Sequence, residues 1–217
     1  MGKNFNTIFG ILLIAGGVLL GLQQFGILGG NVGDALFTGL WAIGAFYFGN
    51  LFLQDRAHWW FALIALILGS WAVSGLLDLL LPGLSIGDAV SGALFLGAIG
   101  AGFLVAYTRQ RSNWWAIIPA GVLFTLAIIS FVDDFPGLVL PFDSGSLLFF
   151  GIGLTFLVIS FMNIEGQRFS WALIPAIVLI AFGVFVGFGQ TQSWNIIWPA
   201  LIILFGAYFL ISSLRKG

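Results

Sequence analysis

The chain contains no cysteine, a single histidine, and few charged residues, which make up 7% of its 217 residues. The lack of cysteine excludes disulfide bonds, thiolate metal sites and cysteine nucleophiles. The formal net charge of −1 provides no basic stripe that would neutralise phosphates, so nucleic acid is not an expected partner. Soluble domains carry roughly 25% charged residues, so this chain lacks the polar surface that a water-soluble fold needs.

What the chain has in place of charge is apolar surface. Hydrophobic residues make up 60% of it, and its mean hydropathy is +1.13. In water, so many apolar side chains would leave large exposed patches and cause aggregation. The 31 glycines are typical of membrane helices, because small residues let helices approach closely where no hydrophobic effect drives them together. We therefore expect an integral membrane protein.

Apolar stretches long enough to cross a bilayer recur along the whole chain. A hydrocarbon core about 30 Å thick needs roughly 20 apolar residues per helix. The first stretch follows Lys3 as a signal peptide would, but no small-residue cleavage site follows it, so we expect it to be retained. The sequence predicts eight transmembrane helices, at about 5–28, 35–53, 58–81, 89–107, 113–132, 146–162, 169–188 and 194–213.

The cationic residues occur at alternate ends of these stretches. All of them lie at a terminus or in every second connection: Lys3, Arg56, Arg109, Arg111, Arg168, Arg215 and Lys216. Positively charged loops stay in the cytoplasm, which places both termini there and the protein in the cell (cytoplasmic) membrane. Six of the eight acidic residues lie at the opposite ends: Asp34, Asp78, Asp88, Asp133, Asp134 and Asp143.

Tryptophans follow the cytoplasmic arginines within a few residues. Amphipathic rings prefer the headgroup level of a bilayer, so these tryptophans are predicted to be interfacial anchors. They are Trp59, Trp60, Trp114, Trp115 and Trp171.

The arginine–tryptophan segments also reveal an internal repeat. Trp60, Trp115 and Trp171 recur at a spacing of about 55 residues, each near the start of an odd-numbered stretch. The pattern predicts one membrane domain over 1–217, built from four tandem helical hairpins at 1–55, 56–110, 111–167 and 168–217. We expect an all-α, polytopic bundle of these hairpins.

The first and last hairpins share a glycine-punctuated Leu/Ile pattern. It includes Gly10, Gly17 and Gly21 near the amino terminus, and Trp198-Pro199 opening a helix that runs to Gly206. This pattern resembles the membrane region of the LiaI/LiaF-like family of bacterial multi-pass proteins. Members of that family with assigned roles act in cell-envelope stress sensing, often beside a two-component histidine kinase. The resemblance implies no catalytic residues.

Small residues spaced four apart mark candidate helix crossings. They are Gly17 with Gly21, Gly97 with Ala93 and Ala101, and Gly183 with Gly187. Such pairs bring helix backbones close together within a bundle or between subunits.

The acidic residues have structural and functional interpretations. Asp34, Asp88 and Asp143 precede even-numbered stretches, where an N-cap role is favoured over a cation site. Asp133 and Asp134 with Asp143 form the best candidate for a divalent ion, but the spacing matches no calcium loop. Intramembrane ionisable residues usually mark transport or proton relay, and none lies near mid-span.

His58 stands beside Arg56 and two tryptophans, where an interfacial anchor is favoured over a pH sensor. No second histidine is present to complete a metal site, and no histidine–acid pair is expected to activate a serine.

Prolines 119 and 175 fall about one turn into odd-numbered stretches, where a proline removes few hydrogen bonds.

These features predict a protein that is not an enzyme and needs no cofactor or metal. The leading hypothesis is an envelope-stress regulator, scaffold or accessory subunit that acts through lateral contacts, with membrane lipids and another membrane protein or a second copy as partners. The alternative is a carrier or channel for an uncharged or apolar small molecule or lipid, because eight helices can enclose a cavity. A third is a subunit that binds lipid or pigment in a larger complex.

Overall fold

The structure is a computed structural model that describes residues 3–27, 30–81, 86–134, 143–164 and 166–189, together with 199, 202, 203 and 206. The fold is all-α, as predicted. Seven helices are described, each close to one of the predicted stretches: α1 (Lys3–Gln24), α2 (Gly30–Gln54), α3 (Trp60–Leu80), α4 (Ile86–Arg109), α5 (Ile117–Asp134), α6 (Ser144–Phe161) and α7 (Leu173–Gly189).

Six of these helices, α2 to α7, are long and apolar enough to cross a membrane, and α1 adds a shorter apolar segment at Leu13–Gln24. With 25 residues, α2 is about 37 Å long at 1.5 Å per residue, which exceeds the hydrocarbon thickness. The multi-pass membrane class is therefore supported. Most of the eighth predicted stretch, 194–213, lies outside the described residues, so the number eight stays a prediction.

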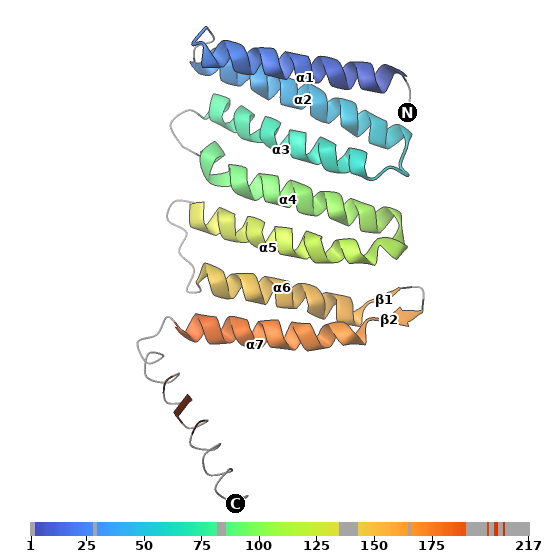
Figure 1. Ribbon diagram of the computed structural model, residues 1–217, viewed down its shortest axis with the longest axis vertical. Coiled ribbons are helices and arrows are strands. Elements are labelled where there is room, and N and C mark those ends of the chain that lie inside the picture. Colours follow the sequence, from blue (N-terminus) through green and yellow to red (C-terminus); the bar gives the residue numbers. More distant parts are fainter. Residues whose placement is uncertain are drawn as a thin grey trace, which may run out of the picture.

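The helices lie side by side in one antiparallel layer (Figure 1). Within the described residues, extensive packing joins each helix only to its neighbours in the chain. Only 11–22% of the residues in each spanning segment are buried. The sequence predicts a bundle of hairpins, whereas the helices of the described residues form an open layer. Lipid solvates apolar side chains as well as other helices do, so apolar composition alone gives no drive to close a ring.

Short connections join the helices at the end of the layer that carries the arginines. The 3-10 helix η1 (Arg111–Ala116) leads into α5, and η2 (Ser170–Ala172) leads into α7. Between α6 and η2 the chain forms a minimal antiparallel ladder, in which β1 (Asn163–Ile164) pairs with β2 (Gln167–Arg168). Gly166 makes this reversal with a φ of 81°, which L side chains rarely adopt.

Pro119 and Pro175 lie in the first turn of α5 and of α7, as the sequence predicts. First-turn amides have no partner within their own helix, so a proline there costs little. A small core forms beside these helix starts from Ile117, Ile159, Phe169 and Ala172.

Helices α5 and α6 cross through two reciprocal threonine–glycine contacts. Thr155 of α6 lies over Gly121 of α5, and Thr125 of α5 lies over Gly151 of α6. Each threonine hydroxyl donates to the carbonyl oxygen four residues earlier, at 2.8 Å for Thr125 and 2.9 Å for Thr155. Because each hydroxyl is hydrogen-bonded within its own helix, only small, apolar surfaces of α5 and α6 meet at the crossing.

Asp143 is the N-cap of α6, which confirms the capping prediction at this position. Its carboxylate accepts from the Gly145 amide at 3.0 Å. The same prediction was wrong for Asp34 and Asp88, because α2 already begins at Gly30 and α4 at Ile86. Both residues therefore lie within their helices and not at the N-cap position.

Replacing Asp143 with alanine is expected to lower the free energy of unfolding by about 1 kcal/mol, because an orphan amide of α6 loses its acceptor. Thermal unfolding in detergent micelles would measure the change. Asp143→Asn is the matched control, since its side-chain oxygen can still accept. Equal unfolding of the alanine and asparagine variants would contradict the capping role.

Candidate functional site

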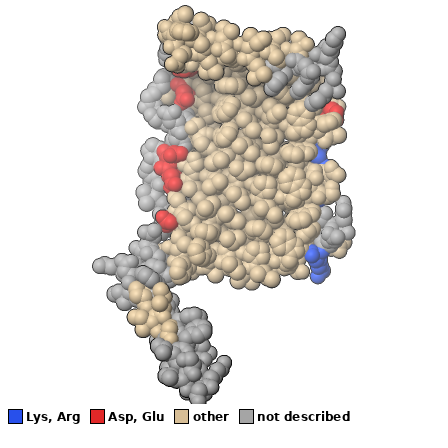
Figure 2. Space-filling view, viewed as in Figure 1, with Lys and Arg blue, Asp and Glu red and all other residues tan. Residues whose placement is uncertain are grey.

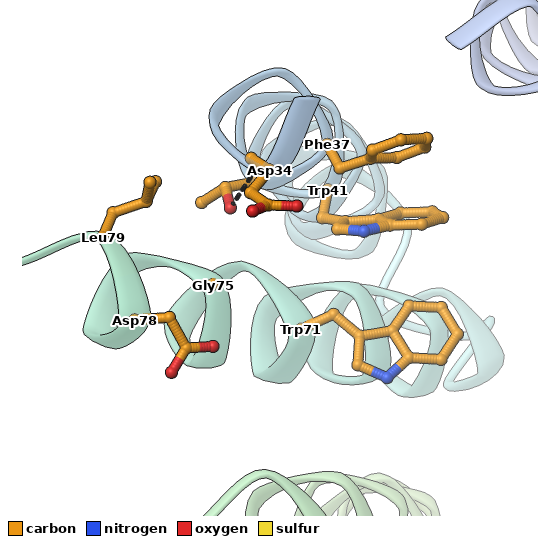
Figure 3. Close-up of a pocket in the computed structure, with 8 residues that line it drawn as sticks. Asp34, Phe37, Trp41, Trp71, Gly75, Asp78 and Leu79 are labelled. Carbon is orange, nitrogen blue, oxygen red and sulfur yellow. Dashed lines mark hydrogen bonds between the residues drawn. The ribbon is translucent and has the colours of Figure 1, made fainter. Parts of the chain in front are cut away.

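A groove of about 400 Å³ lies between α2 and α3. We call it the α2–α3 groove. Figure 3 shows how its side chains are arranged: two carboxylates lie at one end and two indole rings at the other. It is lined by Asp34, Phe37, Thr38 and Trp41 of α2 and by Trp71, Gly75, Asp78 and Leu79 of α3.

The spacing of these residues explains why they share one groove. Asp34 and Trp41 are seven positions apart on α2, and Trp71 and Asp78 are seven apart on α3. Seven residues make about two helical turns, which returns a side chain to nearly the same face. Because α2 and α3 run antiparallel, the reversed order on α3 sets carboxylate beside carboxylate and indole beside indole (Figure 3).

Gly75 permits the close approach at the middle of the groove. A Cβ atom there would collide with the hydroxyl of Thr38. That hydroxyl donates to the carbonyl oxygen of Asp34 at 2.8 Å, so it is already satisfied within α2. The groove is therefore closely packed at its middle, and its charged groups are the carboxylates at one end.

The polar end of the groove is electronegative. Asp34 and Asp78 are both exposed, and no hydrogen bond or ion pair to the Asp34 carboxylate is present among the described residues. Asp78 lies in the last turn of α3, where free carbonyl groups place the negative end of the helix dipole. The positive, amino-terminal end of the α2 dipole lies at the same end of the groove and opposes the α3 dipole, so the negative charge here comes from the two carboxylates.

The other end is aromatic and lies near the middle of the helices. The rings of Trp41 and Trp71 are 5.0 Å apart, and Trp71 stacks on Phe95 of α4 at 5.7 Å with an interplanar angle of 1°. Tryptophans normally gather at the membrane interface, not at mid-span. Trp71 is 41% exposed, so its ring forms part of an accessible surface. The site was not predicted from the sequence, although the seven-residue spacing of aspartate and tryptophan on each helix was a signal for it.

Charges of opposite sign gather at opposite edges of the layer (Figure 2). We call the edge with Asp34, Asp78, Asp133, Asp134 and Asp143 the acidic edge, and the edge with Arg56, Arg109, Arg111 and Arg168 the cationic edge. The sequence predicted this separation, and the antiparallel layer places the helix ends accordingly.

On the acidic edge, the predicted cation cluster is held by local hydrogen bonds. Asp133 accepts from the Ser144 hydroxyl at 2.8 Å, which ties the end of α5 to the start of α6. Asp134 accepts from Ser130 at 3.1 Å. No group of three or more metal-ligating side chains occurs in the part of the chain that the structure describes.

On the cationic edge, the predicted anchors form ring contacts between the starts of α3 and α5 and between the starts of α5 and α7. Trp59 lies 6.5 Å from Trp115, and Trp114 lies 6.4 Å from Trp171. Trp115 and Trp171 are exposed, whereas Trp59, Trp60 and Trp114 are partly buried. Arginine side chains cover two neighbouring rings, Arg109 over Phe52 and Arg111 over Tyr107.

His58 forms a histidine–acid pair with Asp55, which was not predicted from the sequence. Its Nδ1 lies 2.7 Å from a carboxylate oxygen of Asp55, and both side chains are 53% exposed. The tight turn between α2 and α3 brings the two residues together. The exposure of the pair keeps it in a polar environment at the cationic edge.

The predicted packing glycines differ in their surroundings. Gly183 lies against the backbone of Ser146, and Gly187 also faces Ser146, so α7 crosses α6 closely there. Gly97 is in ordinary contact with Ala127. At Gly17 and Gly21 nothing lies within 4 Å of where a Cβ would be. Gly17 lines a second, apolar groove of about 390 Å³ that α1 forms with α2 and α3.

Comparisons with protein-family models, curated proteins and solved structures find no match for this chain.

Proposed function

We propose that this chain is a non-enzymatic protein of the bacterial cytoplasmic membrane that acts through lateral contacts, as an envelope-stress regulator, scaffold or accessory subunit. The observation that carries the proposal is the single layer of helices, which leaves broad apolar faces available to neighbours in the bilayer. The LiaI/LiaF-like pattern of the end hairpins agrees with this role, and we propose membership of that family on the same basis.

Large exposed side chains support a contact surface. Phe46 of α2 is 76% exposed and Ile14 of α1 is 69% exposed. At the other end of the layer, Ile174 of α7 is 70% exposed. Lipid tails can cover such side chains, but a flat layer also lets a partner helix reach many of them at once, because packing between membrane helices rests on shape and close approach.

The single layer of helices also bears on the alternative function, a carrier or channel. A carrier or channel needs an enclosed route, and the single layer formed by the helices described encloses none. That part of the chain alone therefore gives no support to the rival function. The α2–α3 groove also favours a charged ligand over the uncharged substrate of the rival hypothesis, because two carboxylates line it.

For orientation, we propose that the cationic edge faces the cytoplasm and that both termini lie there. The support is the positive-inside rule, applied to the arginines in the connections between spanning segments. The acidic edge, with the polar end of the α2–α3 groove, then faces outward.

Photocrosslinking in living cells tests lateral contact directly. With p-benzoylphenylalanine in place of Phe46 or Phe182, both exposed, we expect discrete adducts with the mass of a partner protein or of a second copy. The matched control is the same replacement at Phe48, which is 2% exposed and should give no such adduct. If every exposed position yields only lipid adducts, the proposal is wrong.

A further inference from the structure

The geometry points to a binding site for a lipophilic organic cation in the α2–α3 groove. The proposal goes beyond lateral contact, because it assigns a small-molecule ligand to one groove of the layer and holds whether or not protein partners bind the faces. It rests on three features that meet in one place: a negative end, an aromatic end, and a volume suited to a small molecule.

The volume sets the size class of the ligand. Small-molecule sites occupy roughly 300–1,000 Å³, and the groove measures about 400 Å³. A metal ion alone would leave most of this space empty. Calcium also takes six to eight oxygen ligands, whereas the lining offers two carboxylates and the Thr38 hydroxyl beside aromatic rings.

The negative charge at one end of the groove favours a positively charged ligand. The Asp34 carboxylate is exposed without a charged partner among the described residues, and the carboxylate of Asp78 lines the same end of the groove. All described arginines lie at the opposite edge of the layer, two helical turns or more beyond the indoles (Figure 2). An anion would find no counter-charge here, whereas a cation would find one.

The rings select an organic cation with an apolar body. Trp41 and Trp71 lie about 10 Å along the helices from Asp34 and Asp78, at seven residues and 1.5 Å per residue. Indole faces attract ammonium-type cations and also stack on flat apolar groups. A ligand with its charge near Asp34 and its apolar groups against Trp71 would match both ends of the groove at once (Figure 3).

Two sources could supply this chemistry: the amine headgroup of a membrane phospholipid with the start of its acyl chain, or a soluble lipophilic cation that partitions into the bilayer. The shared requirement is a positive charge joined to an apolar body. The experiment below separates the two sources by competition.

The test is equilibrium dialysis of the full chain in dodecyl maltoside micelles with labelled tetraphenylphosphonium, after subtraction of protein-free micelles. Tetraphenylborate, an anion of the same shape, is the charge control. We expect saturable binding of the cation and none of the anion. Asp34→Asn should weaken cation binding about tenfold or more, since it removes the nearest opposite charge. Trp71→Leu should weaken it about threefold to tenfold through loss of the ring face.

Asp134→Asn is the matched control for charge, because it removes one carboxylate from the same acidic edge outside the groove, and Trp115→Leu is the matched control for loss of an indole. Both should bind the cation as the unchanged protein does. Thermal unfolding of every variant shows that a loss of binding is not a loss of fold.

Absence of saturable cation binding, equal binding of tetraphenylborate, or unchanged binding by a folded Asp34→Asn variant would each overturn the proposal. If added phosphatidylethanolamine displaces the cation and phosphatidylglycerol does not, the natural ligand is an amine lipid headgroup. If neither lipid displaces it, a soluble lipophilic cation is the ligand.

Discussion

Replacing Gly121 or Gly151 with alanine is expected to lower the free energy of unfolding by about 1–3 kcal/mol, because each new methyl group collides with a threonine across the α5–α6 crossing. The threonines cannot turn away freely, since each hydroxyl is bonded to its own helix and both side chains are buried. The helices must therefore separate, which forfeits close packing over the whole crossing. Unfolding in mixed detergent micelles, followed by circular dichroism, would measure the loss.

Compensation distinguishes a steric cause from a general intolerance of alanine. Gly121→Ala combined with Thr155→Ala should recover much of the lost stability, because the second change removes the atoms that collide. The matched control is Gly39→Ala in α2, where nothing lies within 4 Å of the new Cβ. That variant should be neutral or slightly stabilising, as alanine is the better helix former. Equal destabilisation at Gly39 and Gly121 would contradict the crossing.

Single cysteines at the two edges of the layer are expected to differ almost completely in labelling by a membrane-impermeant maleimide in intact cells. Asn31→Cys, beside the acidic edge, should react from outside. Ser112→Cys, beside Arg111 on the cationic edge, should react only after the membrane is opened. The native chain has no cysteine, so each variant carries one reactive thiol and the unchanged protein is the blank.

Labelling of permeabilised cells is the control for intrinsic reactivity, because both thiols should then react. Reaction of Ser112→Cys in intact cells, with Asn31→Cys protected, would invert the proposed orientation. Reaction of both in intact cells would mean that 31 and 112 do not lie on opposite sides of the membrane, which would contradict the spanning helices as well.

Sequence alone located most of the described helices to within a few residues. The stretches predicted at 146–162 and 169–188 correspond to α6 (Ser144–Phe161) and to η2 with α7 (Leu173–Gly189). The helices can be located in this way because a bilayer requires a certain length of each apolar segment and excludes charge from its interior. The length of the apolar segments and the positions of the charged residues can both be read from the sequence. The separation of Asp and Arg to opposite edges followed from the same rule.

Local detail at the helix ends was harder to predict. The cap at Asp143 was found correctly, whereas Asp34 and Asp88 proved to lie inside helices that begin earlier. The predicted stretch starts at 35, whereas α2 already begins at Gly30 and includes Asn31 and Gly33. Weak helix formers tolerate a helix when neighbouring helices hold it in place.

The sequence by itself determined that the chain is all-α and apolar enough for a membrane, where its helices run, and which of their ends carry positive or negative charge. Only the tertiary structure decided that the described helices form an open layer, that threonines meet glycines between α5 and α6, and that Asp34, Trp41, Trp71 and Asp78 share one groove. The physical reason is that a helix such as α6 is apolar on all sides, so its composition does not show which side meets a neighbour. Contact between membrane helices depends on shape, and shape appears only when the helices are placed together.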